Sequence, residues 1–189
     1  MAASDEAELV RMINTSTEIN DRPCAFRYPR GTGLGSILPS INEKIEIGKS
    51  KIIKEGKKLA ILNFGARLNE TLKAAENLLK KGVPITVVDA RFAKPLDENL
   101  IWHLATTHEA IMTIEEGSIG GFGSHVVNFL TKKGLMDSNL KFRSLTLPDI
   151  FIDQDTPDKM YKVANLDSVS IEEKVLDLLN SNIVLKKQN

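Results

Sequence analysis

From residue 59 onward the sequence alternates short apolar runs with amphipathic segments, and this alternation restricts the fold more than any other feature. The apolar runs, which are typical of buried strands, cover residues 59–64, 85–89, 110–114 and 142–147. Stretches with apolar residues at helical spacing follow each run, for example Leu72, Ala75, Leu78 and Leu79. Because such alternation favours right-handed crossovers, we predict an α/β fold with three layers, in which helices cover both faces of a mostly parallel sheet.

Polar residues predict where several helices begin. Ser4 is a suitable N-cap for a first helix, Asn69 for the helix after residue 64, and Asp97 for the one after residue 89. The last helix carries the spacing of a capping box, Ser170 with Glu173.

The first 57 residues contain too few regular elements for a core of their own. One helix, one short strand and a glycine loop make up residues 1–35, which therefore resemble the tail of a domain. Residues 36–57 read as a linker in which a strand or a short hairpin is possible. The α/β domain is predicted to cover residues 58–182.

Residues 26–35 join the predicted strand to a loop rich in glycine. Phe26 and Tyr28 alternate with Arg27, as in a short strand, and Pro29 ends the pairing. Arg30 follows, beside glycines at 31, 33 and 35. A guanidinium group near bare backbone N–H groups suits a phosphate or a carboxylate, because its planar fork binds two oxygens. Composition alone favours the other interpretation, a surface arginine paired with a carboxylate.

A second candidate site lies after the strand at 110–114. Ligands of parallel sheets bind at the carboxyl ends of the strands, and Glu115 and Glu116 stand at such an end before a glycine loop at 117–123. These carboxylates suit acid–base catalysis, or the loop suits an anion at a helix N-terminus. The interpretation we favour is structural: a tight turn that needs glycine, with a carboxylate that accepts backbone N–H bonds.

Little in the sequence supports a nucleic-acid, membrane, cysteine or metal site. Lys and Arg together equal Asp and Glu at 25 each, so the chain offers no overall charge for nucleic acid. No apolar run approaches the roughly 20 residues of a membrane span, and no signal peptide is evident. The single Cys24 fits the cytoplasm and reads as a small buried residue. No two of His103, His108 and His125 have the spacing of a metal pair on one helix.

Several runs of the sequence resemble the C-terminal part of the 1-deoxy-D-xylulose-5-phosphate synthase family, which belongs to the transketolase superfamily. The resemblance covers nearly the whole chain. Among the runs that carry it are Asp89-Ala90-Arg91-Phe92-Ala93-Lys94-Pro95-Leu96-Asp97 and Gly120-Gly121-Phe122-Gly123. The runs that point to this synthase family specifically are Arg27-Tyr28-Pro29-Arg30-Gly31 and Leu147-Pro148-Asp149-Ile150-Phe151-Ile152.

The resemblance implies a three-domain enzyme of which this chain holds the last part. Residues 1–35 would be the end of the pyrimidine-binding domain, and residues 58–182 the transketolase-type C-terminal domain. The family uses thiamin diphosphate and magnesium to condense pyruvate with glyceraldehyde 3-phosphate, works as a homodimer, and supplies isoprenoid, thiamin and pyridoxal synthesis. Arg30 is the one functional residue carried over, as the arginine that holds the acceptor's phosphate. No catalytic, cofactor or metal residue is carried over, so the chain alone is expected to be inactive and to bind no cofactor.

Two alternatives remain open at this point. The chain could be a non-catalytic oligomerisation or binding module with the same fold. It could also be a part resembling the β subunit of a 2-oxoacid dehydrogenase, because the Arg-Phe-x-Lys-Pro-Leu-Asp run at 91–97 is shared with those subunits. The roles of Glu115, Glu116 and His125 are not decided by the sequence.

Overall fold

A five-stranded sheet lies at the centre of the computed structural model, which describes residues 1–185 and their side chains as far as residue 180. The strand order is β1-β3-β2-β4-β5. The strands are β1 (Lys51–Lys54), β2 (Leu59–Phe64), β3 (Thr86–Asp89), β4 (Ala110–Glu115) and β5 (Lys141–Leu145). Strands β2 to β5 pair in parallel, and β1 runs antiparallel to β3 at one edge. The prediction of a mostly parallel sheet is therefore confirmed.

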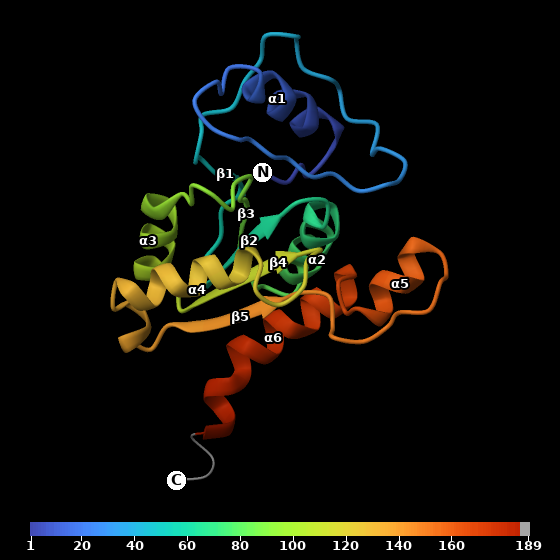
Figure 1. Ribbon diagram of the computed structural model, residues 1–189. Helices are drawn as coiled ribbons and strands as arrows, with labels where there is room; N and C mark the ends of the chain where they lie inside the picture. The colour runs from blue at the N-terminus through green and yellow to red at the C-terminus, as the bar shows by residue number, and fades with distance from the viewer. Residues whose placement is uncertain (186–189) are drawn as a thin grey trace.

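Helices cover both faces of this sheet, as the sequence predicted (Figure 1). One face packs against α2 (Leu68–Lys80) and α6 (Ser168–Leu185), and the other against α3 (Glu98–Thr107) and α4 (Phe122–Lys132). A short 3₁₀ turn, η1 (Leu135–Asp137), follows α4, and α5 (Pro157–Val163) precedes α6. The first helix, α1 (Glu6–Ser16), lies apart from these layers, above the sheet in Figure 1.

The central strand β2 shows why the sheet needs both layers. All six of its residues are buried. Leu59 and Ile61 belong to the core under α2 and α6, whereas Leu62 and Phe64 belong to the core under α3 and α4. Because neighbouring side chains of a strand point to opposite faces, a continuous apolar run requires a cover on each side. Each such buried side chain contributes about 1.5–3 kcal/mol.

The N-terminal segment is tied to the carboxyl end of the sheet. The Ala2 amide donates to the Arg91 carbonyl at 3.0 Å, and the Ser4 hydroxyl donates to the Asp89 carboxylate at 2.6 Å. A small apolar cluster joins the two parts; it consists of Ala3, Met12, Ile45 and Phe92. The segment thus has a core only because it packs on the α/β domain, which agrees with its interpretation as an incomplete unit. The domain boundaries at 35 and 57 stay predictions.

Three predicted helix caps are wrong. Helix α1 is capped by Asp5, whose carboxylate accepts from the Glu8 amide at 2.7 Å. Helix α2 begins after Arg67 and has no side-chain cap. Helix α6 begins at Ser168, and Asp167 accepts from the Ser170 amide at 3.0 Å, so the predicted capping residue lies inside the helix. The helix begins one residue later than predicted for α1, two residues earlier for α2 and three residues earlier for α6. The Asp97 cap of α3 is confirmed.

The predicted Ser4 cap has another partner. Its hydroxyl donates to the Asp89 carboxylate at 2.6 Å, in the contact between the N-terminal segment and β3. A tertiary contact thus displaces the local one. Helix α1 begins at Glu6 as a result.

Two further sequence predictions need correction. The short strand at 26–28 is reduced to a single parallel bridge between Ala2 and Arg27, because no neighbouring strand extends the pairing. Cys24 is exposed and not buried. Strand β1 lies within the predicted linker, where a strand had been considered, although at 51–54 and not around Ile45. Among the helices of the described residues, none is both long and apolar enough to cross a bilayer.

Candidate functional site

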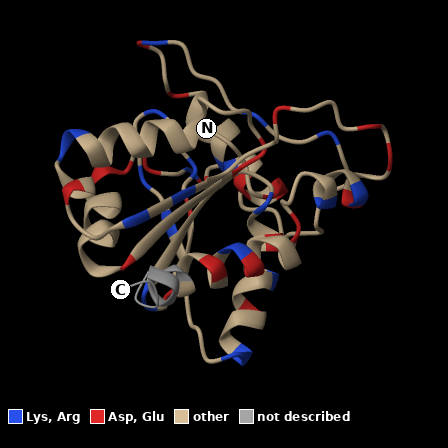
Figure 2. Cartoon of the chain, turned by 90° about the horizontal axis from the view of Figure 1, so that it is seen from below, with Lys and Arg blue, Asp and Glu red and all other residues tan. Residues whose placement is uncertain are grey.

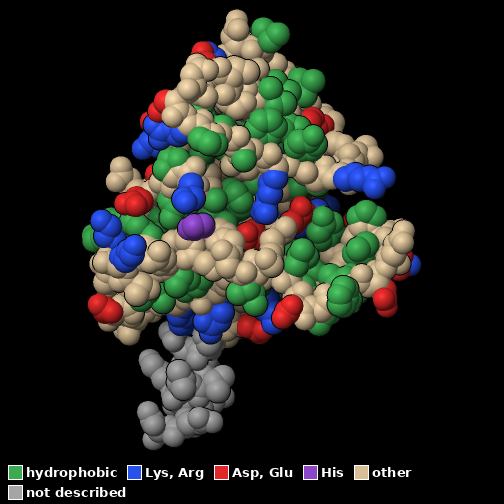
Figure 3. Space-filling model, in the orientation of Figure 1, with side chains coloured by type: hydrophobic (Ala, Val, Ile, Leu, Met, Phe, Trp, Pro, Cys, Tyr) green, Lys and Arg blue, Asp and Glu red, His purple; other side chains and the backbone are tan. Residues whose placement is uncertain are grey.

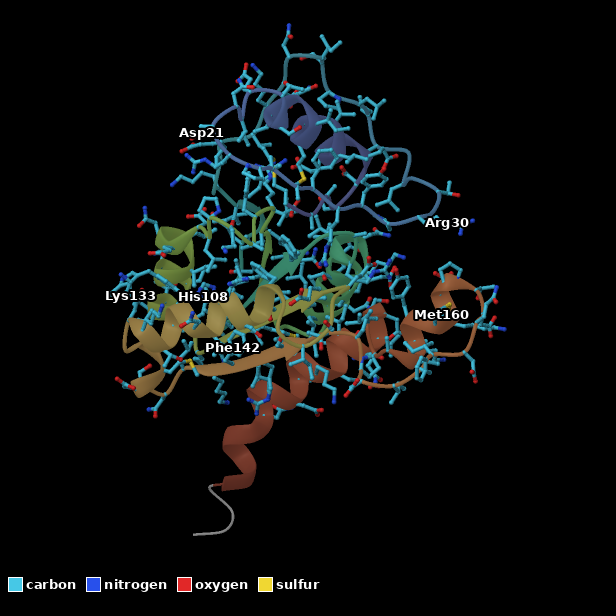
Figure 4. The ribbon with its side chains drawn as sticks, in the orientation of Figure 1. Asp21, Arg30, His108, Lys133, Phe142 and Met160 are labelled. Carbon is cyan, nitrogen blue, oxygen red and sulfur yellow. The ribbon has the colours of Figure 1, made fainter. Side chains whose placement is uncertain are left out.

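A cavity of about 760 Å³ opens at the carboxyl end of the sheet, beside Arg30. Its walls come from the glycine loop after β4, from residues 147–152 after β5, and from α5. Figure 4 shows Arg30 on the N-terminal loop, facing α5, where Met160 is labelled. The volume lies within the range of roughly 300–1,000 Å³ that is usual for small-molecule sites. The N-terminal loop with Arg30 and the segments between residues 118 and 161 are far apart in the sequence and border one cavity.

Arg30 is exposed, and no ion pair or hydrogen bond joins its side chain to any residue that the structure describes. The neighbouring arginine differs: Arg27 stacks over the Phe64 ring at 4.9 Å and approaches the Glu115 carboxylate at 3.8 Å. The interpretation of Arg30 as paired with a carboxylate thus fails for the described residues. Its guanidinium remains available to an anion at the edge of the cavity.

The glycine loop next to Arg30 already holds an anion of the chain itself. The Glu6 carboxylate accepts from the amides of Leu34 at 3.0 Å, Gly35 at 2.5 Å and Ser36 at 2.8 Å. Backbone hydrogen bonds, first from its own amide and then from these three, lower the pKa of Glu6 against a small opposing effect of burial. The loop therefore offers Arg30 no bare N–H groups at these three residues, contrary to the sequence interpretation.

Glu115 has the structural role that the sequence analysis favoured. Its side chain is buried, and one carboxylate oxygen accepts from the Gly123 amide at 2.9 Å, at the start of α4. A Cβ at Gly117 or Gly121 would come within 3.0 Å of this carboxylate, so the loop requires glycine there. Glu115 thus fixes the loop that forms one wall of the cavity.

Glu116 and Tyr161 join the cavity's walls to α2. The Glu116 carboxylate forms an ion pair with Arg67 Nε at 2.6 Å, and the Arg67 guanidinium carbon lies 3.5 Å from the centre of the Tyr161 ring. Tyr161 borders the cavity, and its pKa is raised to about 12 by burial and by its hydrogen bond to Glu116. This phenol therefore stays protonated at neutral pH. The contact between Arg67 and Tyr161 could not be predicted from the sequence, because only packing brings the start of α2 and α5 together.

A second polar cluster lies beneath α1 and is closed to solvent. Asp89 is 1% exposed and accepts from the Ser4 hydroxyl at 2.6 Å and from the Arg91 amide at 3.2 Å. Burial raises the pKa of Asp89 to about 6, against the lowering effect of the Ser4 hydrogen bond; the nearby Glu8 carboxylate raises it further. Glu8 in turn pairs with both Arg91, at 2.8 Å, and Arg11, at 3.1 Å. The sequence marked Asp89 only as the end of a strand.

The three histidines remain apart. His103 is exposed on α3, and His125 is half-buried on α4. His108 follows α3 and lies 2.8 Å from the Thr86 hydroxyl, and its pKa is lowered by burial. Figure 4 shows His108 on the side of the molecule opposite Arg30. None of them borders the cavity beside Arg30.

Comparison with known proteins agrees with this geometry. A sequence model of the family described as "Transketolase, C-terminal domain" matches residues 48–171. The chain belongs to the transketolase C-terminal domain family. The match includes strand β1 as well as the helices and strands that follow it, as far as the start of α6.

A solved structure extends the similarity beyond this transketolase C-terminal domain. The protein is titled "Split gene transketolase, inactive beta4 tetramer"; the two structures superpose with a TM-score of 0.80 at 25% identity. The match covers 95% of this chain, so it includes the N-terminal segment with α1. The chain spans 57% of the length of that protein.

The residues of this chain do not fit the magnesium diphosphate that the resemblance implies for the whole enzyme. Within residues 1–185, no three His, Cys, Asp or Glu side chains come together as metal ligands. The two carboxylates at the end of β4, Glu115 and Glu116, are already bound to the Gly123 amide and to Arg67. No chemical step through this cofactor can therefore be derived from these residues.

Proposed function

We propose that the chain is the C-terminal part of a thiamin-diphosphate-dependent transferase, the 1-deoxy-D-xylulose-5-phosphate synthase. The complete enzyme condenses pyruvate with glyceraldehyde 3-phosphate to 1-deoxy-D-xylulose 5-phosphate and carbon dioxide. In this proposal Arg30 binds the phosphate of glyceraldehyde 3-phosphate. The observation that carries the proposal is that Arg30 stands exposed at the edge of the 760 Å³ cavity, with no partner among the described residues.

The chemistry of the surroundings supports a phosphate at this position. A phosphate accepts two hydrogen bonds from one guanidinium group, and such charged bonds are about twice as strong as neutral ones. The carboxylate that contacts the adjoining loop, Glu6 of α1, already accepts hydrogen bonds from three backbone amides. The run from Arg27 to Gly31 is one of two that resemble the synthase specifically; the other, residues 147–152, lines the same cavity.

The cofactor would be held by residues outside this chain. We expect thiamin diphosphate and magnesium to bind to the domains that precede residue 1 in the complete enzyme, and the protein to be a cytoplasmic homodimer. The similar protein is described as an inactive tetramer of β chains of a split-gene transketolase. That description supports a chain that is inactive alone and associates with copies of itself.

Kinetics of the complete enzyme test the role of Arg30. Arg30→Ala should raise the KM for glyceraldehyde 3-phosphate by about ten- to a hundredfold, since a charged hydrogen bond contributes roughly 1.5–3 kcal/mol. The KM for pyruvate should change little. Arg30→Lys should restore binding in part, because lysine keeps the charge but not the planar fork.

The matched control is Arg22→Ala, because Arg22 is also exposed and pairs only with its neighbour Asp21. It should leave both KM values unchanged. An Arg30→Ala enzyme with unaltered acceptor kinetics would refute the assignment of this residue.

A non-catalytic oligomerisation or binding module is the second candidate. The word "inactive" in the description of the similar tetramer favours it. The intact mass of the protein isolated from its source separates the candidates: a mass well above that of these 189 residues favours the enzyme. A part similar to the β subunit of a 2-oxoacid dehydrogenase would instead support acyl transfer, and glyceraldehyde 3-phosphate would not be an acceptor.

A further inference from the structure

A second cavity, of about 770 Å³, lies on the other side of the α/β domain from Arg30. It is bordered by the turn at 47–49, by residues 93–99 between β3 and α3, and by α4. Figure 4 places Lys133, at the end of α4, and Arg30 on opposite sides of the molecule. The two cavities share no lining residue.

Lysine side chains dominate the charge of this second cavity. Four of them border it: Lys49, Lys94, Lys132 and Lys133. The face of the molecule in Figure 3 shows basic side chains gathered around a histidine, above α4. None of the four forms an ion pair with a carboxylate of the described residues, whereas the lysines at 44, 73, 81 and 159 do. Four unpaired cations at one cavity are notable in a chain whose formal net charge is zero.

The carboxylates that border this cavity do not cancel these charges. Asp97 is 8% exposed, and its two oxygens accept from the amides of Ser50 at 2.9 Å and Leu100 at 3.2 Å. Glu98 is the one remaining carboxylate among the lining residues. Four lysines therefore face two carboxylates, one of which is occupied by backbone amides. Figure 2 shows the Lys, Arg, Asp and Glu residues of the whole chain, seen from below.

The other lining groups indicate a small organic anion and not an ion alone. His125 and Asn128 of α4 add hydrogen-bonding groups between the lysines and the glycine loop. Pro95 and the exposed Ile47 add apolar surface, whereas Phe129 is largely buried, with Lys133 Nζ 5.8 Å from the centre of its ring. The volume exceeds that of inorganic phosphate and agrees with sites for small ligands of roughly 300–1,000 Å³. Lysines act as point charges that can surround several oxygens, as a diphosphate presents.

We infer that this lysine-lined cavity binds a small organic diphosphate, of the size of a nucleoside diphosphate. The lysines hold the diphosphate, and Ile47 and Pro95 contact the organic part. The inference does not depend on the proposed function, because it uses no residue of the cavity beside Arg30. The compact shape and the zero net charge favour a small ligand over nucleic acid, which needs an extended basic surface.

Calorimetric titration of the 189-residue chain with inorganic pyrophosphate, ADP and citrate tests the inference. Pyrophosphate and ADP should bind one per chain at low ionic strength, and ADP should bind more tightly. Lys132→Gln with Lys133→Gln should weaken both by about tenfold or more. The matched control is Lys159→Gln with Lys162→Gln on α5, which changes the net charge equally and should leave binding unchanged.

A second measurement locates the ligand without a variant. Amide NMR signals of His125 and Asn128 should shift when pyrophosphate is added to the unaltered chain, and those of α5 should not. Absence of heat and of shifts would overturn the inference. Equal affinity for citrate would show a response to charge alone and would also overturn the inference. A single-stranded RNA that binds at these residues while pyrophosphate does not would overturn it as well.

Discussion

Replacing Asp89 by asparagine should stabilise the protein at neutral pH and not at low pH. Asp89 is buried between β3 and the N-terminal segment, and its pKa is raised from 3.8 to about 6 chiefly by burial. In the folded state its proton is therefore held more tightly than in the unfolded chain. The stability that depends on this proton is present below pH 3.8 and is lost as the pH rises to about 6.

The magnitude follows from the size of the shift. One pKa unit corresponds to about 1.36 kcal/mol, so the shift of Asp89 corresponds to about 3 kcal/mol. Asparagine has the shape of the protonated carboxyl group. Its amide oxygen can accept from the Arg91 amide, and its amide nitrogen can donate to the Ser4 hydroxyl, so both existing contacts are kept. The variant lacks the buried negative charge, with its repulsion from Glu8 and its weaker attraction to Arg91.

Urea unfolding of both proteins, followed by circular dichroism between about pH 4 and pH 8, measures this effect. The free energy of unfolding of Asp89→Asn minus that of the unaltered protein should rise by about 3 kcal/mol across this range, with most of the rise below pH 7. Asp153→Asn is the control: Asp153 is exposed and lies on the loop before α5. A difference for Asp89→Asn that stays constant with pH would refute the reasoning, because it would mean that the buried carboxyl titrates alike in both states.

Three other predictions concern the loops and the cofactor. Gly56→Ala should destabilise the protein by about 1–3 kcal/mol or more in thermal unfolding, because a Cβ there would meet three backbone atoms of Ile85 within 3.0 Å. Gly31→Ala is the control, because open space surrounds that position, and its unfolding temperature should change little. Glu115→Gln should cost about 1–3 kcal/mol in urea unfolding, because the Gly123 amide and Arg27 lose their buried charged partner; an unchanged stability would contradict the structural role of Glu115. Calorimetry of the Lys132→Gln, Lys133→Gln chain with thiamin diphosphate and magnesium should show no specific heat, and one-to-one micromolar binding would show that the chain holds a cofactor site after all.

The order of strands and helices could be predicted from the sequence, because burial imposes a regular spacing on the apolar residues of each element. The nearly continuous apolar run of β2 indicates a strand covered on both faces. The stripe of Ile171, Val175 and Leu178 fits α6, where these side chains are buried. The turn at Glu115 could also be interpreted correctly. A carboxylate at a strand end, followed by closely spaced glycines, implies backbone contacts that a Cβ would block.

Contacts between distant segments determine the features that the sequence predicted wrongly, such as the cap of α1 and the partners of the loop beside Arg30. The sequence suggested Ser4 as a helix cap, but its hydroxyl is bound to Asp89, 85 residues away, and Asp5 caps the helix instead. The loop beside Arg30 was expected to present free amides, yet Glu6 occupies them from 28 to 30 residues away. The spacing of apolar residues along the sequence indicates which side chains are buried, whereas helix-cap preferences reflect only the immediate neighbours in the sequence. Which carboxylate meets which amide depends on how α1 packs on the sheet, and only the tertiary structure determines that.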